Sequence, residues 1–300
     1  MELKGKTAIV TGAGTGVGRQ LAIEFARAGA NVVCCGRRAG RLQETVGLIE
    51  KVSGSGRSLA VDVTKWHEVR RMAETTMEAF GGIDLLFNNA GSFRAVGPVW
   101  EADPELWWQD VKTNLLGSML CCRAVLPHMI KAGTGVIINM DGGGGSLGPN
   151  VGGSAYGCSK AALLRLTEGL AAELEREGHH VLAFCMMPGF VRSEMTDYLT
   201  ETPERRRWQA HVEGLRGSPS DFPPDACAKA TMKLLEIAAP ELNGRIFYVD
   251  TDFRRISENK QRIRQEDLYV MHRVTLRGIQ REWPLLDSDA PAIWPEHSRA

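Results

Sequence analysis

Short apolar runs alternate with longer amphipathic segments along most of the chain, and this alternation constrains the fold more than any other feature. The β-branched runs predict seven strands, at Thr7–Val10, Val32–Cys35, Leu59–Val61, Ile83–Phe87, Val136–Asn139, Val181–Met186 and Ile246–Val249. Apolar residues at helical spacing mark segments between them, such as Val17–Ala28, Lys65–Phe80, Pro104–Lys131 and Ser154–Glu177. Such alternation predicts an α/β fold, a doubly wound three-layer sandwich around a seven-stranded parallel sheet.

The alternation ends near Asp250, and residues 1–250 are predicted to form a single domain. A chain of 300 residues with 43% hydrophobic residues can bury a core of this size. Residues 251–300 are predicted to form a C-terminal extension. Its first part, Arg254–Gln265, is charged and helical in pattern, and its last part, Trp283–Pro295, is rich in proline.

Charge balance and cysteine spacing exclude several classes of protein. Lysine plus arginine equals aspartate plus glutamate at 36 each, so no net field draws the chain to nucleic acid or to an anionic membrane. No run of the sequence is expected to span a membrane, which predicts a soluble, cytoplasmic protein. The seven cysteines include no C-x-x-C pair, which favours buried thiols over disulfides. No cluster has the spacing of metal ligands, so no metal is expected.

A glycine-rich turn follows the first predicted strand and leads directly into a helix. Its glycines Gly12, Gly16 and Gly18 have the spacing G-x-x-x-G-x-G. Glycines let the backbone approach a pyrophosphate, whose charge is held by the free amides and the positive dipole of the helix start. The turn therefore predicts a Rossmann-type domain. Its expected cofactor contacts are Gly12, Gly14, Thr15, Gly16, Val17 and Gly18.

The end of the second predicted strand indicates which dinucleotide fits. An acidic residue at this place binds the ribose 2′-hydroxyl, whereas an arginine binds a 2′-phosphate. The chain has Arg37 and Arg38 there, with no Asp or Glu between Glu24 and Glu44. Two guanidinium groups without a carboxylate nearby in the sequence favour NADP(H) over NAD(H). The alternative is that both arginines are ordinary surface residues.

Five further motifs follow in order along the chain. They are Asp62-Val63, Asn88-Asn89-Ala90-Gly91, Asn114, Tyr156-Gly157-Cys158-Ser159-Lys160 and Pro188-Gly189-Phe190-Val191-Arg192-Ser193. Together with the glycine turn, this set resembles the classical short-chain dehydrogenase/reductase (SDR) family from about Lys4 to Asp250. The resemblance implies a cofactor that lies across the carboxyl edge of a seven-stranded parallel sheet, and a homodimer or homotetramer.

The resemblance also implies roles for single residues. Asp62 and Val63 would contact the adenine, and Ser193 would help to hold the nicotinamide carboxamide. The residues that it assigns to the cofactor are Asp62, Val63, Asn89, Ala90, Gly91, Tyr156, Lys160, Pro188, Gly189, Val191 and Ser193.

The tyrosine motif suggests how a proton reaches the substrate. A carbonyl reduced by hydride becomes an alkoxide, and Tyr156 is the candidate acid for it. Lys160 lies four residues further on, on the same helix face, and its charge is expected to lower the pKa of the phenol. Asn114 would sustain a water relay to bulk solvent, as the resemblance implies. The alternative for Tyr156 and Lys160 is a chance pair on a helix surface.

A serine expected from the resemblance is missing. The family places it twelve to fourteen residues before the tyrosine, where this chain has Gly144, Gly143 and Gly142, preceded by Asp141. One lost hydrogen bond to a developing oxyanion costs a few kcal/mol of transition-state stabilisation. Three explanations stay open. A neighbour such as Asp141, Ser146 or a glycine amide replaces the hydroxyl, the glycines make room for a bulky substrate, or the site has lost activity.

Aromatic and apolar residues are expected around the substrate. The loop after Pro188 carries Phe190 and Met195, and Phe93 follows the Asn-Asn-Ala-Gly motif. Asp141, Gly142 and Gly143 complete the predicted substrate side. The sequence thus predicts an NADP(H)-dependent reductase of an apolar or aromatic ketone or aldehyde. Two alternatives remain, an imine or activated C=C reductase and a low-turnover NADP-binding regulatory protein.

Overall fold

The structure, a computed structural model, describes residues 1–146, 148–271, 273–275 and 278–280. They fall into two compact units, Met1–Val270 and Met271–Ala300. The second unit contains an antiparallel pair of short strands, β8 (Arg273–Thr275) and β9 (Gly278–Gln280). The predicted proline-rich tail, Trp283–Pro295, lies outside the described residues.

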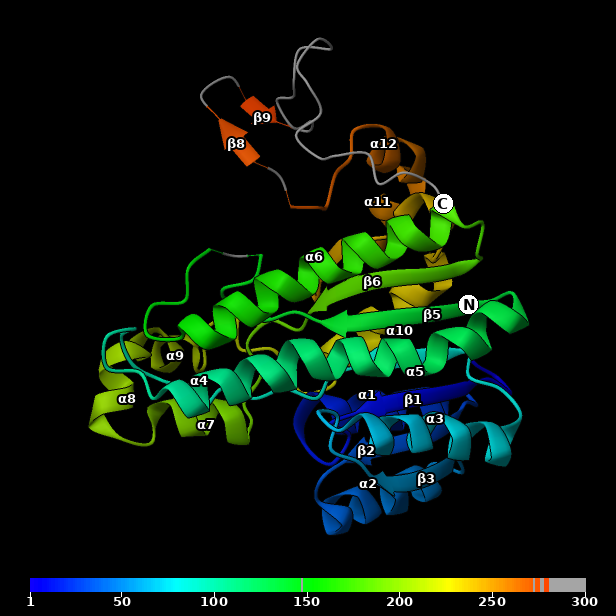
Figure 1. Ribbon diagram of the computed structural model, residues 1–300, viewed down its shortest axis with the longest axis horizontal. Coiled ribbons are helices and arrows are strands. Elements are labelled where there is room, and N and C mark those ends of the chain that lie inside the picture. Colours follow the sequence, from blue (N-terminus) through cyan, green and yellow to red (C-terminus); the bar gives the residue numbers. More distant parts are fainter. Residues whose placement is uncertain (147, 272, 276–277, 281–300) are drawn as a thin grey trace, which may run out of the picture. The chain divides into compact units, whose positions relative to one another are not determined.

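The first unit is built on a seven-stranded sheet in which every strand is parallel to its neighbours (Figure 1). The strands are β1 (Thr7–Thr11), β2 (Asn31–Gly36), β3 (Ser55–Ala60), β4 (Leu85–Asn88), β5 (Gly135–Met140), β6 (Val181–Met187) and β7 (Ile246–Tyr248). Their order, β3-β2-β1-β4-β5-β6-β7, confirms the predicted doubly wound fold. The carboxyl ends of all seven strands meet at one edge, where sheets of this kind bind ligands.

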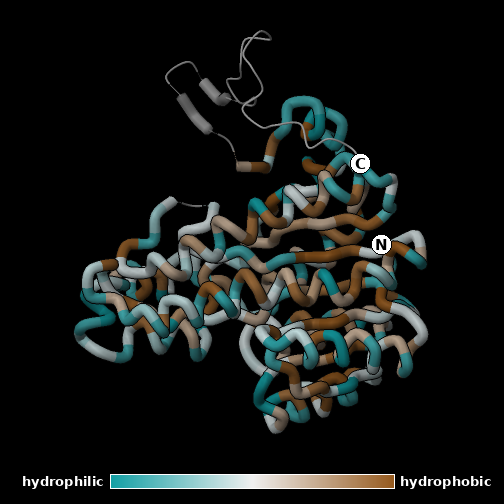
Figure 2. The backbone as a smooth tube through the Cα atoms, in the orientation of Figure 1, coloured by the Kyte–Doolittle hydropathy of each residue, from teal (hydrophilic) through white to brown (hydrophobic). Residues whose placement is uncertain are grey.

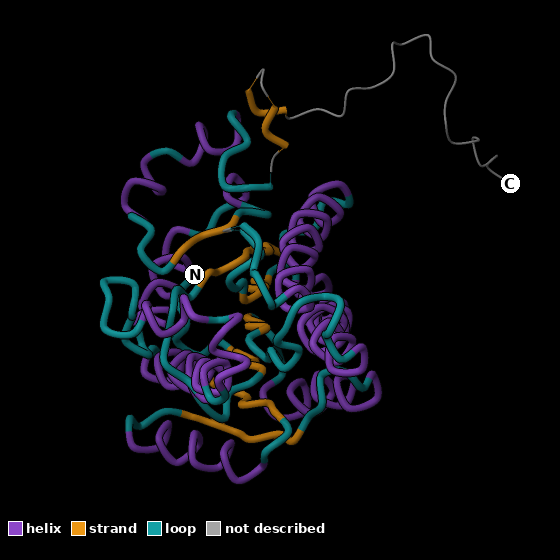
Figure 3. Tube along the Cα trace, turned by 90° about the vertical axis from the view of Figure 1, so that its left-hand side faces the viewer, coloured by secondary structure: helices purple, strands orange, loops and turns teal. Residues whose placement is uncertain are grey.

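Helices cover both faces of the sheet, and Figure 3 shows them on either side of the central strands. One hydrophobic core forms under α1 (Gly16–Arg27), α2 (Ala39–Lys51) and α10 (Ala226–Ile237). A second core forms under α3 (Trp66–Phe80), α5 (Gly117–Ala132) and α6 (Ser154–Arg176). Figure 2 shows the hydrophobic residues concentrated along the central strands. Burial on both faces explains why these strands are continuous apolar runs rather than alternating ones.

The edge strand β3 begins earlier than the sequence predicts. The predicted strand was Leu59–Val61, whereas β3 covers Ser55–Ala60 and pairs with β2 along its whole length. Its residues are exposed or partly exposed, because the sheet ends at this strand. An edge strand with so little buried surface carries only a weak apolar signal, and the prediction of its bounds was therefore wrong.

A long helix connects β4 to β5. It consists of α4 (Pro104–Val111), a π-helical turn η1 (Lys112–Leu116) and α5. The span Pro104–Ala132 is long and apolar enough to cross a membrane by length and composition only, with a mean hydropathy of 1.2 over an 18-residue stretch, a length that was not expected from the sequence. In the fold, 44% of that 18-residue stretch is buried inside the protein. Leu120 and Val125 pack into the second core, so the apolar residues of the helix have a structural reason in this fold.

The compact unit continues beyond Asp250, the predicted end of the domain. Two short helices follow β7, α11 (Phe253–Glu258) and α12 (Lys260–Gln265), in the region predicted to be helical. Phe253, Ile256 and Ile263 are buried in the first core. Because these three side chains belong to the core, residues 251–270 pack with the domain, and the compact unit extends to Val270.

The segment after β6 contains helices where the sequence suggested a loop. They are α7 (Glu194–Thr200), α8 (Pro203–Trp208) and α9 (Ala210–Leu215), and a 3-10 turn η2 (Pro240–Leu242) precedes β7. Each of the three helices is seven residues or shorter, so the helical periodicity is too brief to be recognised in the sequence. They lie near α4 at the carboxyl edge of the sheet (Figure 1).

Candidate active site

The glycine turn after β1 leaves the start of α1 open. Gly12 and Gly16 have positive φ angles of 66° and 55°, which favour glycine. A Cβ atom on Gly18 would overlap the Gly12 carbonyl oxygen, so the third glycine is needed for close packing of turn and helix. Thr15 is the N-cap of α1 but makes no side-chain cap hydrogen bond. The Thr15 hydroxyl accepts a hydrogen bond of 3.5 Å from Arg38, and the first-turn amides of α1 could hold a dinucleotide pyrophosphate.

Asn89 stabilises this turn from the end of β4. Its side-chain Nδ2 donates hydrogen bonds to the carbonyl oxygens of Thr11 at 2.9 Å and Gly12 at 3.2 Å. The amide nitrogens of Asn89 and Ala90 both donate to Thr11 Oγ1 at 3.0 Å. Asn89 and Ala90 therefore fix the backbone of the glycine turn, and Gly91 leaves room beside them, with Asn114 Oδ1 3.4 Å from the position of a Cβ.

Arg37 and Arg38 follow β2, and in the fold each lies near an acidic residue that the local sequence did not reveal. Arg38 forms an ion pair with Glu194 at 2.8 Å, and Arg41 lies 4.0 Å from the same carboxylate. Glu194 is the first residue of α7, far along the chain from β2. The expectation that no carboxylate is near the arginines was drawn from local sequence only, and it is wrong because the fold brings α7 to this edge.

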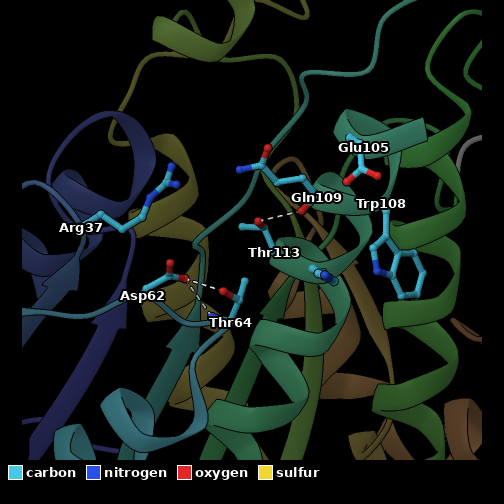
Figure 4. Close-up of a pocket in the computed structure, with 8 residues that line it drawn as sticks. Arg37, Asp62, Thr64, Glu105, Trp108, Gln109 and Thr113 are labelled. Atoms are coloured by element: carbon cyan, nitrogen blue, oxygen red, sulfur yellow. Dashed lines mark hydrogen bonds between the residues drawn. The ribbon is translucent and has the colours of Figure 1, made fainter. Parts of the chain in front are cut away.

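Arg37 lies beside Asp62 at the mouth of a cavity of about 220 Å³ (Figure 4). Asp62 accepts hydrogen bonds from the Thr64 amide at 3.0 Å and the Thr64 hydroxyl at 2.8 Å. Partial burial acts to raise the pKa of Asp62, but these hydrogen bonds and the charge of Arg37 outweigh it and lower the pKa. Residues of the long helix, including Trp108 and Thr113, line the opposite wall. Val63, also assigned to the adenine by resemblance, is only 6% exposed.

Tyr156 lies near the start of α6 and meets the glycine run that follows β5. Its ring stacks on Phe93, with centroids 4.5 Å apart and ring planes at 8°. A Cβ atom on Gly142 would overlap the hydroxyl of Tyr156. Gly143, by contrast, has open space, since the nearest atom to its Cβ position is Asn150 Nδ2 at 4.0 Å. The phenol thus lies where a side chain at position 142 would be, whereas a Cβ at position 143 would make only an ordinary contact with Asn150.

Lys160 is buried behind Tyr156. Its side chain is 3% exposed, and Nζ donates a hydrogen bond of 2.6 Å to the carbonyl oxygen of Met140, the last residue of β5. Nζ lies 5.5 Å from the centroid of the Tyr156 ring. Burial lowers the pKa of Lys160 to about 8, although the charge of Asp141 acts in the opposite direction.

The pKa of Tyr156 is raised, which is opposite to the direction predicted from the sequence. Burial is the largest cause, followed by the negative charges of Asp141 and Asp110. Both carboxylates disfavour the phenolate; Asp141 was expected near the site only as a substitute for the serine, and Asp110 was not expected there. The prediction failed because it considered one charge, Lys160, without the low dielectric and the two carboxylates that surround the ring.

Asn114 connects the long helix to α6. It lies in the π-helical turn and is fully buried. Its Oδ1 accepts from the Ser92 amide at 2.7 Å, and its Nδ2 donates to Ser92 O and to Ser159 Oγ, both at 2.9 Å. Ser159 Oγ in turn donates to the carbonyl oxygen of Tyr156 at 2.7 Å. Asn114 therefore anchors the segment that carries Tyr156, and its proposed part in a water relay stays a prediction.

Asp110 is a buried acidic residue that the sequence reasoning missed. It accepts hydrogen bonds from the Ser92 hydroxyl at 2.5 Å and from the amides of Arg94 and Ala95 at 2.8 and 2.9 Å. These contacts hold the loop that carries Phe93 under the tyrosine. Its place four residues before Asn114, on the same helix face, is a signal that was available in the sequence.

Apolar residues predicted to face the substrate do gather at Tyr156. Phe93 is buried in a small separate cluster, against which Tyr156, Phe190, Met195 and Tyr198 pack. Their common location agrees with the predicted apolar wall.

The residues between Phe190 and α7 hold that segment in place. Ser193 forms a capping box with Thr196 at the start of α7, and Gly16 lies next to it, with Ser193 Cβ 3.7 Å from the Gly16 Cβ position. Gly189 has a φ of 68°, and a Cβ there would overlap the ring of Phe222. Pro188, Gly189, Val191 and Ser193 thus bring the α7 segment next to the glycine turn.

Comparison with known proteins identifies the family. The short chain dehydrogenase profile matches residues 6–204. The chain belongs to the short-chain dehydrogenase family. The short chain dehydrogenase mpl6 of Monascus purpureus is 32% identical over 269 residues, which cover 88% of this chain and 87% of that protein. This chain is therefore an NAD(P)-dependent oxidoreductase of the SDR family.

Two further relatives have more specific descriptions. The (2S)-[(R)-hydroxy(phenyl)methyl]succinyl-CoA dehydrogenase subunit BbsD of Thauera aromatica is 31% identical over 257 residues, covering 83% of this chain and 96% of BbsD. A candidate NAD(P)-dependent gluconate 5-dehydrogenase from Beutenbergia cavernae, solved with NADP at low occupancy, superposes with a TM-score of 0.73 at 29% identity. That alignment covers 85% of this SDR and 98% of the other chain.

A first prediction concerns the glycine run of this SDR. Gly142→Ala should lower kcat/KM by about 100-fold, because its methyl group overlaps the Tyr156 hydroxyl and displaces the ring. Gly169→Ala further along α6, where no atom lies within 4 Å of the Cβ position, should cause a much smaller loss. Steady-state kinetics with NADPH and a reactive ketone would measure both. Equal losses would contradict the packing inferred here for Tyr156.

A second prediction concerns the buried charge of Lys160. Its pKa is lower in the folded protein, about 8, than the ordinary value of 10.5, so the unfolded chain binds more protons between these values. The free energy of unfolding should therefore rise with pH between 8 and 10.5, by about 3 kcal/mol in total from this group. Lys160→Met should abolish this rise. Urea unfolding of both proteins across this pH range measures it, and parallel pH profiles would contradict it.

Proposed function

We propose that this SDR is an NADP(H)-dependent reductase of an apolar or aromatic ketone or aldehyde. The observation that carries the proposal is the position of Tyr156. Its ring stacks on Phe93 beside the apolar cluster, and its hydroxyl lies where a side chain on Gly142 would be, directly after β5. A proton donor and an apolar wall therefore lie together at the edge of the sheet that receives a dinucleotide in this fold.

The residues of the chain divide the chemistry between them. NADPH supplies the hydride when it is bound. The Tyr156 hydroxyl donates a proton to the carbonyl oxygen, which would otherwise carry the developing negative charge. Stacking on Phe93 and the hydrogen bond from Ser159 to the Tyr156 carbonyl fix the ring and its backbone. Lys160 keeps a positive charge near the phenol and holds the end of β5 through Met140.

The missing serine is best explained by space. The hydroxyl of Tyr156 fills the position of a side chain at Gly142, and Gly143 leaves its own position free. A serine at position 143 would restrict the size of the substrate. With glycine there, a bulkier substrate fits. The same vacancy weakens the clamp on a carbonyl oxygen, and it is the feature that favours the second candidate, reduction of an imine or an activated C=C bond. Asp141 is 1% exposed and is not placed to touch a substrate.

The preference for NADP(H) rests on Arg37 and Arg38. Arg38 follows β2, and one of its nitrogens lies 3.5 Å from the Thr15 hydroxyl of the pyrophosphate turn. A 2′-phosphate at this place would replace Glu194 as the partner of Arg38 and form charge-assisted hydrogen bonds. The NADP bound in the protein from Beutenbergia cavernae supports the choice by analogy.

An aromatic substrate is supported by the apolar cluster and by one relative. BbsD is named for a substrate with a phenyl-substituted alcohol, and its likeness to this chain extends over most of both proteins. We also infer a homodimer or homotetramer. Trp108 and Leu116 on the long helix are 50% and 37% exposed, which is a large apolar surface to leave in water and supports an interface there.

A third prediction tests the proton donor. Tyr156→Phe should lower kcat for ketone reduction by about 100- to 10,000-fold, because the general acid is lost. NADPH affinity, measured by fluorescence, should change little, and Tyr248→Phe on β7 serves as the matched control. A panel of ketones, enals and cyclic imines identifies the reaction. If Tyr156→Phe equals the wild type on every active substrate, the assignment fails, and if no substrate turns over, the regulatory alternative gains support.

A fourth prediction tests the cofactor. Arg38→Ala should weaken NADPH binding by roughly 10- to 100-fold, since a charge-assisted hydrogen bond to the phosphate is lost, and should leave NADH binding nearly unchanged. Arg37→Ala is tested in parallel, and Arg70→Ala on α3 is the control for loss of a surface charge. Calorimetric titration gives the NADPH and NADH affinities of the wild type and of each variant. An unchanged ratio of NADPH to NADH affinity in both variants would refute the preference for NADP(H).

A further inference from the structure

Asp141 is a buried carboxylate without an obvious structural purpose. It follows β5 directly and is 1% exposed. Its Oδ2 accepts a hydrogen bond of 2.6 Å from the Ser146 hydroxyl, and its Oδ1 is buried with no hydrogen-bond partner among the described residues. Burial raises the pKa of Asp141, whereas the hydrogen bond from Ser146 and the charge of Lys160 act to lower it, so a positive charge nearby helps to keep the buried carboxylate ionised.

Lys160 is the charge that faces it. Lys160 Nζ donates to the carbonyl of Met140, which immediately precedes Asp141. A Cβ atom on Gly145 would overlap Asp141 Oδ1 and lie 3.1 Å from Lys160 Cβ, so both side chains flank this one glycine. The absence of a side chain at Gly145 is therefore what lets the carboxylate reach the side of Lys160. The glycine run has a second use here besides making room for the phenol.

The other ionisable groups around this pair are few. Tyr156 lies on the same helix as Lys160. The charge of Asp110, on the long helix, acts on Tyr156, and Cys185 on β6 interacts with the charges of Asp141 and Lys160. Burial raises the pKa of the Cys185 thiol, which keeps it neutral. Asp141 and Lys160 are thus the opposite charges nearest to the phenol, with Asp110 as a further negative charge.

The two charges act on the phenol in opposite directions. A lysine ammonium favours the phenolate, and a carboxylate disfavours it. Burial is the largest cause of the raised pKa of Tyr156, and the charge of Asp141 is the next. Asp141 also raises the pKa of Lys160 against the effect of burial. One carboxylate therefore favours the charged form of the lysine and, at the same time, the neutral form of the tyrosine.

We propose that Asp141 is a positioning residue, the buried counter-ion of Lys160, which keeps Tyr156 in its proton-donating form up to higher pH than a lysine alone would allow. The inference rests on the proposed role of Tyr156 as the proton donor. Asp141 takes no part in binding the substrate oxygen and does not replace the serine hydroxyl. It extends the pH range over which the phenol can deliver a proton, acting through charge alone.

The test follows ionisation of Tyr156 directly, in the cofactor-free full-length protein. Tyrosinate absorbance is titrated with pH, and the same titration of Tyr156→Phe is subtracted to isolate this residue among four tyrosines. Asp141→Asn removes the charge and keeps the shape. Ser146→Ala is a milder variant that removes a hydrogen bond favouring the ionised carboxylate. Gly143→Ala, whose methyl group enters open space, is the control for a change in the glycine run.

The expected result is a fall of the Tyr156 midpoint by on the order of one pH unit in Asp141→Asn. A smaller fall is expected in Ser146→Ala, and no shift in Gly143→Ala. The alkaline limb of kcat/KM for reduction should move down by the same amount in Asp141→Asn. An unchanged midpoint in folded Asp141→Asn, or in Ser146→Ala if the first variant does not fold, overturns the proposal.

The titration separates this proposal from the proposed function. If Tyr156→Phe retains full activity, Tyr156 is not the proton donor, yet the midpoint in the cofactor-free protein still reports whether Asp141 controls its ionisation. If the midpoint shifts but the alkaline limb does not, the electrostatic pair is real and its link to catalysis is refuted.

Discussion

The burial of the Lys160 ammonium under the end of β5 is the constraint on which the arrangement of the site depends. A charge removed from water needs an acceptor and a counter-ion close by. The Met140 carbonyl is the acceptor, and Asp141 provides the negative charge. Because Asp141 must fit between β5 and α6, the chain after it has to be narrow, and Gly145 meets that need. The burial of Lys160 on α6 is thus a reason for the glycine at position 145, on the segment that follows β5.

The four glycines after Asp141 form one continuous run in the sequence, but each has a different place in the packing of the site. Gly142 leaves room for the Tyr156 hydroxyl, and Gly145 leaves room for the Asp141 carboxylate. Gly144 has a φ of 91°, and its Cβ would lie 2.9 Å from the Cα of Gly157 on α6. Gly143 alone adjoins open space. The run therefore packs closely around Tyr156 and Asp141, and only at Gly143 would a Cβ meet no atom nearer than 4.0 Å.

Charge pairing also ties the cofactor edge to the substrate side. Glu194 starts α7, the helix that carries Met195 of the apolar cluster, and it pairs with Arg38 at the opposite edge of the glycine turn. The ion pair of Arg38 with Glu194 thus joins the end of β2 to the segment that packs against Tyr156. Exposed ion pairs are individually weak, so such a link can be broken and formed at little cost.

The sequence by itself determined the fold class, the glycine turn and the order of the family motifs, because hydrophobic periodicity and short motifs are local properties of the chain. The motifs predicted that Tyr156, Lys160 and Asn114 act together, and in the fold Asn114 reaches the tyrosine segment through Ser159, while their catalytic roles stay a prediction. Only the tertiary structure decided the electrostatics. Glu194 beside Arg38, and Asp110 and Asp141 around Tyr156, come from segments distant in sequence, and burial sets how strongly each charge acts. A pKa depends on the summed field and on the exclusion of water at one point in space, and no local pattern of residues contains that information.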